Sequence, residues 1–244
     1  MRGGLVTAAL LAFDTSTEAL AAALQVGGRL WSVNGEGGAA ASARLLPQLR
    51  QLMDDGGVAW TQLEAIAFGH GPGAFTGLRT ACAVAQGLAF GAGLPLCPLD
   101  SLLIVAEGVR AEHAPNRGEI DVVMDARMGE VYAGRYAWAG CEWQPRLAPA
   151  LYTLDGLHAW WAGAPPRCVA GSALAAFGAQ LQVGPARRIE AEFDRAAALM
   201  RLAQMQWRRA GGIDPADALP LYLRDKVAMT VAERAALRAA EEAR

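Results

Sequence analysis

The residues best suited to chemistry begin with a glycine-rich stretch, GHGPGAFTGLR, which runs from Gly69 to Arg79. It lies between an apolar run at 65–68 and a long segment of small residues, a place where loops often bind phosphates. A Walker loop needs a lysine after its last glycine, and this loop has none. The dinucleotide-binding pattern fits only in part, because Pro72 removes a backbone donor and the next acidic residue, Asp100, comes late. The loop alone therefore does not predict a phosphate site.

Two aspartates form a second candidate group, because each stands at the end of an apolar strand. Asp14 precedes the turn residues TST, and Asp125 precedes ARMGE. Carboxylates at such positions can hold a metal through water, but an aspartate at a strand end also commonly caps a turn. Thr15 is expected to be one of the turn hydroxyls. Both roles stay open for the two aspartates.

The segments around these aspartates resemble each other. From Leu10 and from Ile120, the pattern in each case is a strand ending in aspartate, a polar turn with an acidic residue, a second strand, a glycine turn and a third strand. Helix-like and strand-like segments then alternate. Two such meanders predict a duplicated α/β fold, in which two halves with mixed sheets face each other across a cleft. Two unrelated hairpins are the alternative. We place the halves at 1–104 and 105–218, with a tail at 219–244 that packs back on the first half.

Composition narrows the function classes. The net charge is −2, which gives no overall electrostatic reason for binding nucleic acid or a membrane. Four cysteines and three histidines are scattered without CxxC or HxxxH spacing, so neither a disulfide framework nor a cysteine/histidine metal site is expected. The stretch 80–99 carries no charge and is long enough to span a bilayer, but glycine and proline interrupt it, so we do not expect a membrane helix. The N-terminus does not resemble a secretory signal. We expect a cytoplasmic protein.

The helix predicted at 74–92 carries small residues at every fourth position. They are Gly73, Gly77, Ala81, Ala85 and Ala89. Residues at this spacing share one face, and a face without bulky side chains lets another polypeptide approach closely. Phe75, Leu78, Cys82 and Leu88 lie off this stripe and can fill the core of the same domain. We therefore expect the stripe to contact a partner, with packing inside the domain as the alternative.

Five segments, in order, resemble one family. They are DTSTEALAAAL, RLLP, GPGAFTGLR, DARMGEVY and PLYLR, and the likeness covers most of the chain from about residue 8 to 229. The set is similar to the TsaB (YeaZ) family. The resemblance implies the duplicated fold of actin, Hsp70 and the sugar kinases, which is ribonuclease H-like. It implies a non-catalytic subunit for tRNA threonylcarbamoyladenosine synthesis, which pairs with a TsaD-type transferase and a TsaE-type ATPase. It also implies a homodimer when the chain is alone, with tRNA as the substrate of the complex.

The resemblance also implies roles for residues. The family's dimer contact uses helices of the first half, so the predicted partner interface is Gly73, Phe75, Thr76, Gly77, Ala81, Ala85, Ala89, Leu45 and Leu49. The metal-binding histidines of TsaD-like proteins align with Ser101 and Val105, which cannot replace them. A degraded nucleotide cleft is predicted at Asp14, Thr15, Asp125, Arg127, Glu130 and Gly171. No cofactor is expected on the chain alone, which leaves ATP or ADP for the partner interface.

Several points stay open. Arg127 and Glu130 flank a tight turn and can pair with each other, while Arg224 can anchor the tail to the first half or contact tRNA. An ATP-dependent kinase of the actin-like class is the main alternative function, which Asp14, Asp125 and the AGSA segment at 170–173 suggest, although AGSA lacks one glycine of that class's adenosine-binding turn. A glycoprotease-like hydrolase is the third.

Overall fold

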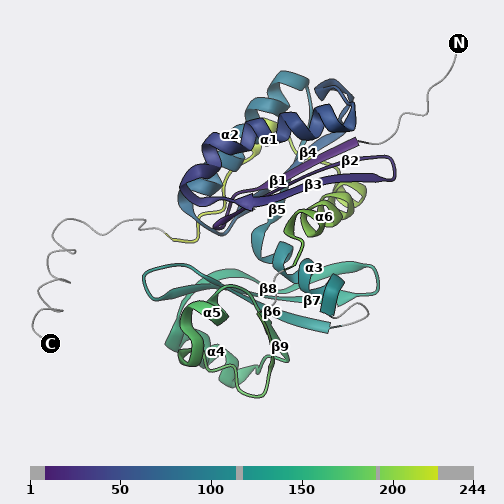
Figure 1. Ribbon diagram of the computed structural model, residues 1–244. Coiled ribbons are helices and arrows are strands. Elements are labelled where there is room, and N and C mark those ends of the chain that lie inside the picture. The colour runs from purple at the N-terminus through teal and green to yellow at the C-terminus, as the bar shows by residue number, and fades with distance from the viewer. Residues whose placement is uncertain (1–8, 114–117, 191–192, 225–244) are drawn as a thin grey trace, which may run out of the picture.

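Two five-stranded sheets, one above the other in Figure 1, organise the chain. The computed structural model describes residues 9–113, 118–190 and 193–224. The strand orders are β3-β2-β1-β4-β5 and β10-β9-β6-β7-β8. In each sheet the first three strands form an antiparallel meander, and the last two run parallel to the first. The two halves thus share one topology, which confirms the predicted duplication and the ribonuclease H-like fold.

The first half contains five strands and three helices. They are β1 (Ala9–Asp14), β2 (Ala19–Val26), β3 (Arg29–Glu36), α1 (Ala41–Gly56), β4 (Ala65–Gly71), α2 (Phe75–Ala92), β5 (Leu96–Asp100) and α3 (Ser101–His113). The predicted helices at 42–54 and 74–92 are confirmed. In α1 the apolar residues recur at helical spacing, and Leu45, Leu49 and Leu52 are all buried against the sheet.

The second half repeats the pattern with shorter elements. They are β6 (Gly118–Asp125), β7 (Glu130–Ala139), β8 (Glu142–Thr153), α4 (Leu154–Gly163), β9 (Cys168–Ala170), α5 (Ala173–Phe177) and β10 (Arg187–Ile189), followed by α6 (Arg195–Ala210). Within the described ranges, no helix has both the length and the hydropathy needed to cross a membrane.

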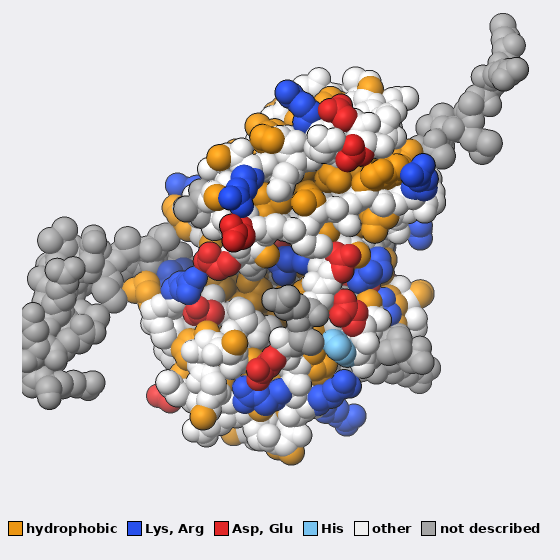
Figure 2. Space-filling view, in the orientation of Figure 1, with side chains coloured by type: hydrophobic (Ala, Val, Ile, Leu, Met, Phe, Trp, Pro, Cys, Tyr) orange, Lys and Arg blue, Asp and Glu red, His pale blue; other side chains and the backbone are white. Residues whose placement is uncertain are grey.

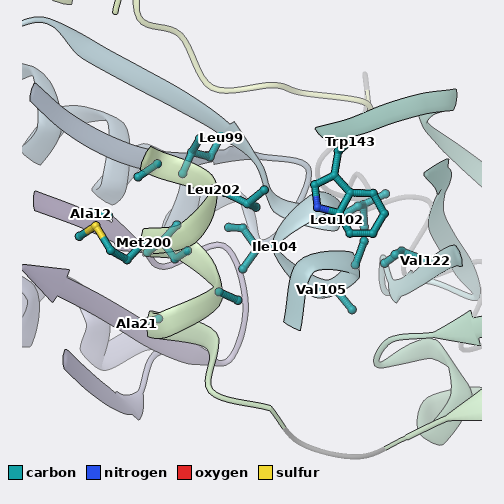
Figure 3. Packing of buried hydrophobic residues seen from close by; sticks show 14 of the residues in the cluster. Ala12, Ala21, Leu99, Leu102, Ile104, Val105, Val122, Trp143, Met200 and Leu202 are labelled. Atoms are coloured by element: carbon teal, nitrogen blue, oxygen red, sulfur yellow. The ribbon is translucent and has the colours of Figure 1, made fainter. Parts of the chain in front are cut away.

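Helix α6 does not stay with the half that precedes it in sequence. It packs against β1, β2 and α3, so it covers the face of the first sheet opposite α1 and α2 (Figure 1). Figure 3 shows Met200 of α6 beside Ala12 of β1, inside a buried cluster that both halves share. Assigning 105–218 to the second half therefore misplaces this helix, because its apolar face is completed only by the alanine-rich side of the first sheet.

A buried polar contact joins the halves at the end of β5. Tyr136 of β7 donates a hydrogen bond of 2.5 Å from its Oη to Asp100 Oδ2. The other carboxylate oxygen of Asp100 accepts from the amides of Leu102 and Leu103 and so caps α3. Burial raises the pKa of the Asp100 carboxyl to about 6, although these hydrogen bonds oppose the shift.

This raised pKa gives a pH prediction for Asp100→Asn. The folded protein holds the Asp100 proton at a higher pH than the unfolded chain does, so this group lowers the free energy of unfolding as pH rises from about 4 to 6. The asparagine variant cannot titrate at this position. Its free energy of unfolding should therefore rise relative to that of the parent across this pH window, by on the order of 2 kcal/mol. Urea denaturation of both proteins at pH 4.5 and 7 measures the difference. Parallel pH profiles would show that Asp100 ionises normally.

Candidate functional site

A cleft of about 860 Å³ lies between the two halves, and three of the six predicted cleft residues, Asp125, Arg127 and Gly171, line it. Figure 2 shows side chains of both charges along this boundary. The turn after β1 lines one wall, and the turn after β6 and the start of α5 line the other. The described polar residues around it are Ser16, Thr17, Glu18, Asn34, Asp125, Arg127, Ser172, Glu190 and Arg195.

Asp14 does not line this cleft; it is buried behind two lining residues, Ser16 and Arg195, and forms an internal ion pair with Arg195. Its side chain is fully buried, and Arg195 approaches its Oδ2 to 2.6 Å with Nη2 and 2.9 Å with Nε. The amide and the hydroxyl of Ser16 each donate to the same carboxylate at 3.0 Å. Thr15 turns away from the cleft and donates to the carbonyl of Gly77 at 2.7 Å. The carboxylate that could have served a metal is thus neutralised by a guanidinium.

Arg195 itself was not among the predicted site residues, and the start of α6 holds it in place. Asp194 caps the helix by accepting from the amide of Ala197 at 3.0 Å. Asn34 of β3 donates to Asp194 at 2.9 Å and accepts from the amide of Ala196 at 3.0 Å. An arginine in a first helical turn faces the positive end of the helix dipole and therefore needs an acidic partner. That position was the one sequence signal pointing to Arg195.

The turn after β6 has an unusual backbone. Arg127 and Met128 have φ values of 63° and 57°, followed by Gly129 at 74°. Arg127 reaches across the cleft to Glu18 at 2.7 Å and also contacts Asp125 at 3.2 Å. Of the alternatives left open for this turn, the pairing of Arg127 with Glu130 does not form, because Glu130 pairs with Arg224 at 2.6 Å.

Gly171 serves close packing at the cleft wall. Its φ is 118°, and a Cβ there would lie 2.2 Å from the carbonyl oxygen of Val123. The neighbouring Ser172 accepts a hydrogen bond from the amide of Asp125 at 3.1 Å. The ends of β6 and β9 thereby approach each other as closely as backbone allows.

These residues do not fit a kinase-type phosphate site. The cleft is large enough for a small ligand. However, Asp14 is held by Arg195, and the turn after Asp125 places the side chains of Arg127 and Met128 where a phosphate-binding turn needs small residues and free backbone amides.

The two positions that align with the metal-binding histidines of TsaD-like proteins are both buried. At the first, the hydroxyl of Ser101 accepts a hydrogen bond from the amide of Gly71 at 3.2 Å. Val105 is buried beside it in α3.

The small-residue stripe of α2 faces inward, so its prediction as the partner surface is wrong. Ala81, Ala85 and Ala89 have no exposed area, and the same holds for Leu45 and Leu49 of α1.

The two glycines of the stripe show why it faces inward. A Cβ on Gly77 would lie 1.8 Å from the carbonyl oxygen of Thr15, and one on Gly73 would lie 2.3 Å from that of Ser16. The stripe therefore lets α2 approach the backbone of the turn after β1. Of the predicted interface residues, Thr76 is exposed and Phe75 is half-buried.

The outward face of α2 also carries small residues. Ala83, Gly87 and Gly91 are exposed, and a Cβ on either glycine would meet nothing within 4 Å. Phe90 beside them has 61% of its surface exposed, and Leu46 of α1 has 48%. We call these five residues the outward face.

Comparisons with known proteins agree with this architecture. The model of the TsaD family, described as tRNA N6-adenosine threonylcarbamoyltransferase, matches residues 38–182. TsaB of Haemophilus influenzae is 41% identical over 123 residues, which cover 50% of this chain and 51% of that protein. TsaB of Escherichia coli is 35% identical over 148 residues, covering 58% of this chain and 63% of that protein. The matched region thus spans about half to under two thirds of these curated relatives.

A solved structure extends the likeness over the whole fold. YeaZ from Pseudomonas aeruginosa superposes with a TM-score of 0.78 at 36% identity, covering 88% of this chain and 100% of that one. A second crystal structure, of an uncharacterized Pseudomonas aeruginosa protein with similarity to the peptidase YeaZ, gives 0.80, also at 36% identity, covering 89% of this chain and 100% of that one. With the family-model match, the shared topology and the motif set, these likenesses show that the chain belongs to the TsaB (YeaZ) family, related to TsaD.

Proposed function

We propose that this chain is a non-catalytic partner subunit in the synthesis of tRNA threonylcarbamoyladenosine, and that it pairs with a TsaD-type transferase. One observation carries the proposal: the chain keeps the duplicated fold and the cleft, but the strand-end carboxylate of Asp14 is buried beneath the cleft and neutralised by Arg195 at 2.6 Å. A chain whose key carboxylate is committed internally supports activity through contact with another subunit. The names of its relatives, tRNA threonylcarbamoyladenosine biosynthesis proteins, indicate which pathway.

The outward face is the surface we assign to the transferase. A glycine inside a helix costs about 0.5–1 kcal/mol relative to alanine. At Gly77 the fold requires a glycine, because a Cβ there would collide with the carbonyl oxygen of Thr15. At Gly87 no atom lies within 4 Å of where a Cβ would stand, so packing inside the chain does not require a glycine there. A helix from a second polypeptide would supply the reason, with Phe90 and Leu46 as exposed apolar contacts.

The remaining partners are part of the same proposal. A TsaE-type ATPase joins the pair, tRNA is the substrate of the complex, and ATP or ADP binds at the interface with the transferase. The outward face also supports a homodimer when the transferase is absent, since a patch that accepts a related fold can accept a second copy of this chain.

Reconstitution tests the function. The purified chain is mixed with its TsaD-type and TsaE-type partners, tRNA and the threonylcarbamoyl donor, and modified adenosine is measured by mass spectrometry of digested tRNA. We expect modification to require this chain. Equal modification in its absence would rule out the proposed role.

Ala83→Arg tests the surface. The arginine would project from an exposed site, so the fold should persist while association with the transferase weakens by at least about tenfold, or 1.4 kcal/mol. Ala159→Arg, at an exposed position of α4 in the second half, is the matched control. Calorimetric titration measures both. If Ala83→Arg binds the transferase with wild-type affinity, the interface does not include this face of α2.

A further inference from the structure

Residues 219–224 run along the outside of the molecule from the first half to the second. At the first half, the amide of Leu221 donates to the carbonyl of His70 at 2.7 Å. Gly71 lies directly beneath, where a Cβ would come within 2.8 Å of the carbonyl oxygen of Leu221. The backbone of this segment is therefore packed tightly on the end of β4.

Tyr222 fixes the same segment to the start of α2. Its ring centroid lies 5.2 Å from that of Phe75, and its Oη accepts a hydrogen bond of 3.0 Å from Arg79 Nε. The guanidinium of Arg79 in turn lies 3.8 Å from the Phe75 ring centroid. These three side chains form one stacked group on the helix that also carries the outward face.

Arg224, two residues further on, holds the second half. It contacts Glu130 at 2.6 Å through Nη1, and through Nη2 it donates to the carbonyls of Ala126 and Arg127 at 3.0 and 3.2 Å. Its side chain is only 14% exposed, so these charge-assisted contacts are partly shielded from water.

The turn that Arg224 holds needs outside support. Left-handed conformations cost a non-glycine residue roughly 1–2 kcal/mol, and this turn contains two in succession, at Arg127 and Met128. The side chain of Arg127 then spans the cleft to Glu18. The same turn therefore also carries an ion pair that bridges the two sides of the cleft.

We infer that residues 219–224 form a strap that couples the start of α2 to the turn 126–130 on the far side of the cleft. A change at the stacked Tyr222 group alters the mobility of that turn, although Tyr222 lies on the other half. This inference rests on the proposed function in one respect only, the identification of the transferase as the partner that contacts α2. The strap itself is a property of the isolated chain.

Amide hydrogen exchange on the isolated full-length chain tests the strap. The readouts are the amides of Ala126 and Glu130, whose hydrogen bonds close the turn at 3.0 and 3.1 Å. Arg224→Ala should speed their exchange at least about tenfold, since it removes the contacts that hold the turn. Tyr222→Ala, which removes only first-half contacts, should speed it several-fold. Arg209→Ala, at an exposed arginine of α6, is the control and should change nothing.

The decisive comparison is between the two strap variants. If Tyr222→Ala leaves the turn amides at the parental rate, Arg224 is merely a local brace and the strap is refuted. Arg79→Ala, which removes the hydrogen bond to Tyr222 from the helix side, repeats the test without altering the strap. Exchange in the core of the first sheet reports global unfolding and should stay constant. Because no partner is present, failure here leaves the proposed function standing, and loss of transferase binding in Ala83→Arg neither supports nor refutes the strap.

Discussion

Gly77→Ala is expected to lower the free energy of unfolding by about 3 kcal/mol or more. Its new Cβ would lie 1.8 Å from the carbonyl oxygen of Thr15 and 2.9 Å from the carbonyl carbon. Both are backbone atoms of the turn that directly follows the central strand β1, so they cannot move aside as a flexible side chain could. The hydrogen bond from Thr15 Oγ1 to the carbonyl of Gly77 ties the two segments together and would be strained as well.

Gly87→Ala, ten residues along the same helix, is the matched control and should have the opposite effect. It adds the same methyl group where nothing lies within 4 Å, so alanine's better helix propensity should raise stability by about 0.5–1 kcal/mol. Urea denaturation of both variants at pH 7 measures the contrast. Stabilisation by both would mean that α2 is rotated relative to the packing described above.

The sequence predicted the elements because local patterns determine them. Strands ending at Asp14 and Asp125 were recognised from apolar runs followed by polar turns, and their repetition led directly to the duplicated fold. The orientation of α2 could not be obtained this way. Spacing by four shows that Gly77 and Ala81 share a face, but the outward side of the helix also carries small residues. Only the closeness of the β1 turn, a long-range contact, decides which face is inside.

The site shows the same limit. The cleft residues at both strand ends were predicted, whereas Arg195 and Arg224 acquire their roles from chain segments that cross from one half to the other. Arg195 lies 181 residues from Asp14 in sequence, and α6 reaches the first sheet only after the second half is complete. Arg224 was expected to anchor the tail to the first half or to contact tRNA; its side chain binds the turn after β6, which belongs to the second half and not the first. No local pattern encodes such pairings.

Arg195→Ala should be the most disruptive change in the cleft. It leaves the carboxylate of Asp14 buried with only Ser16 as a described partner, and breaking a buried pair by removing one member costs about 3–5 kcal/mol. Arg208→Ala, at an exposed arginine of the same helix, should change stability by less than about 0.5 kcal/mol. Denaturant unfolding curves, followed by circular dichroism, measure the free energy of unfolding of both variants.

The double variant Asp14→Asn with Arg195→Met separates the charge from the packing. Asparagine can still accept the hydrogen bond from the Ser16 amide, and methionine fills part of the space that Arg195 occupies beside it. Because neither charge remains buried, most of the lost stability should return. If the double variant is as unstable as Arg195→Ala, the guanidinium matters for its shape and its contact with Ser16, not for neutralising Asp14. Recovery would instead establish that this arginine compensates a carboxylate which the fold retains in a buried position beneath its cleft.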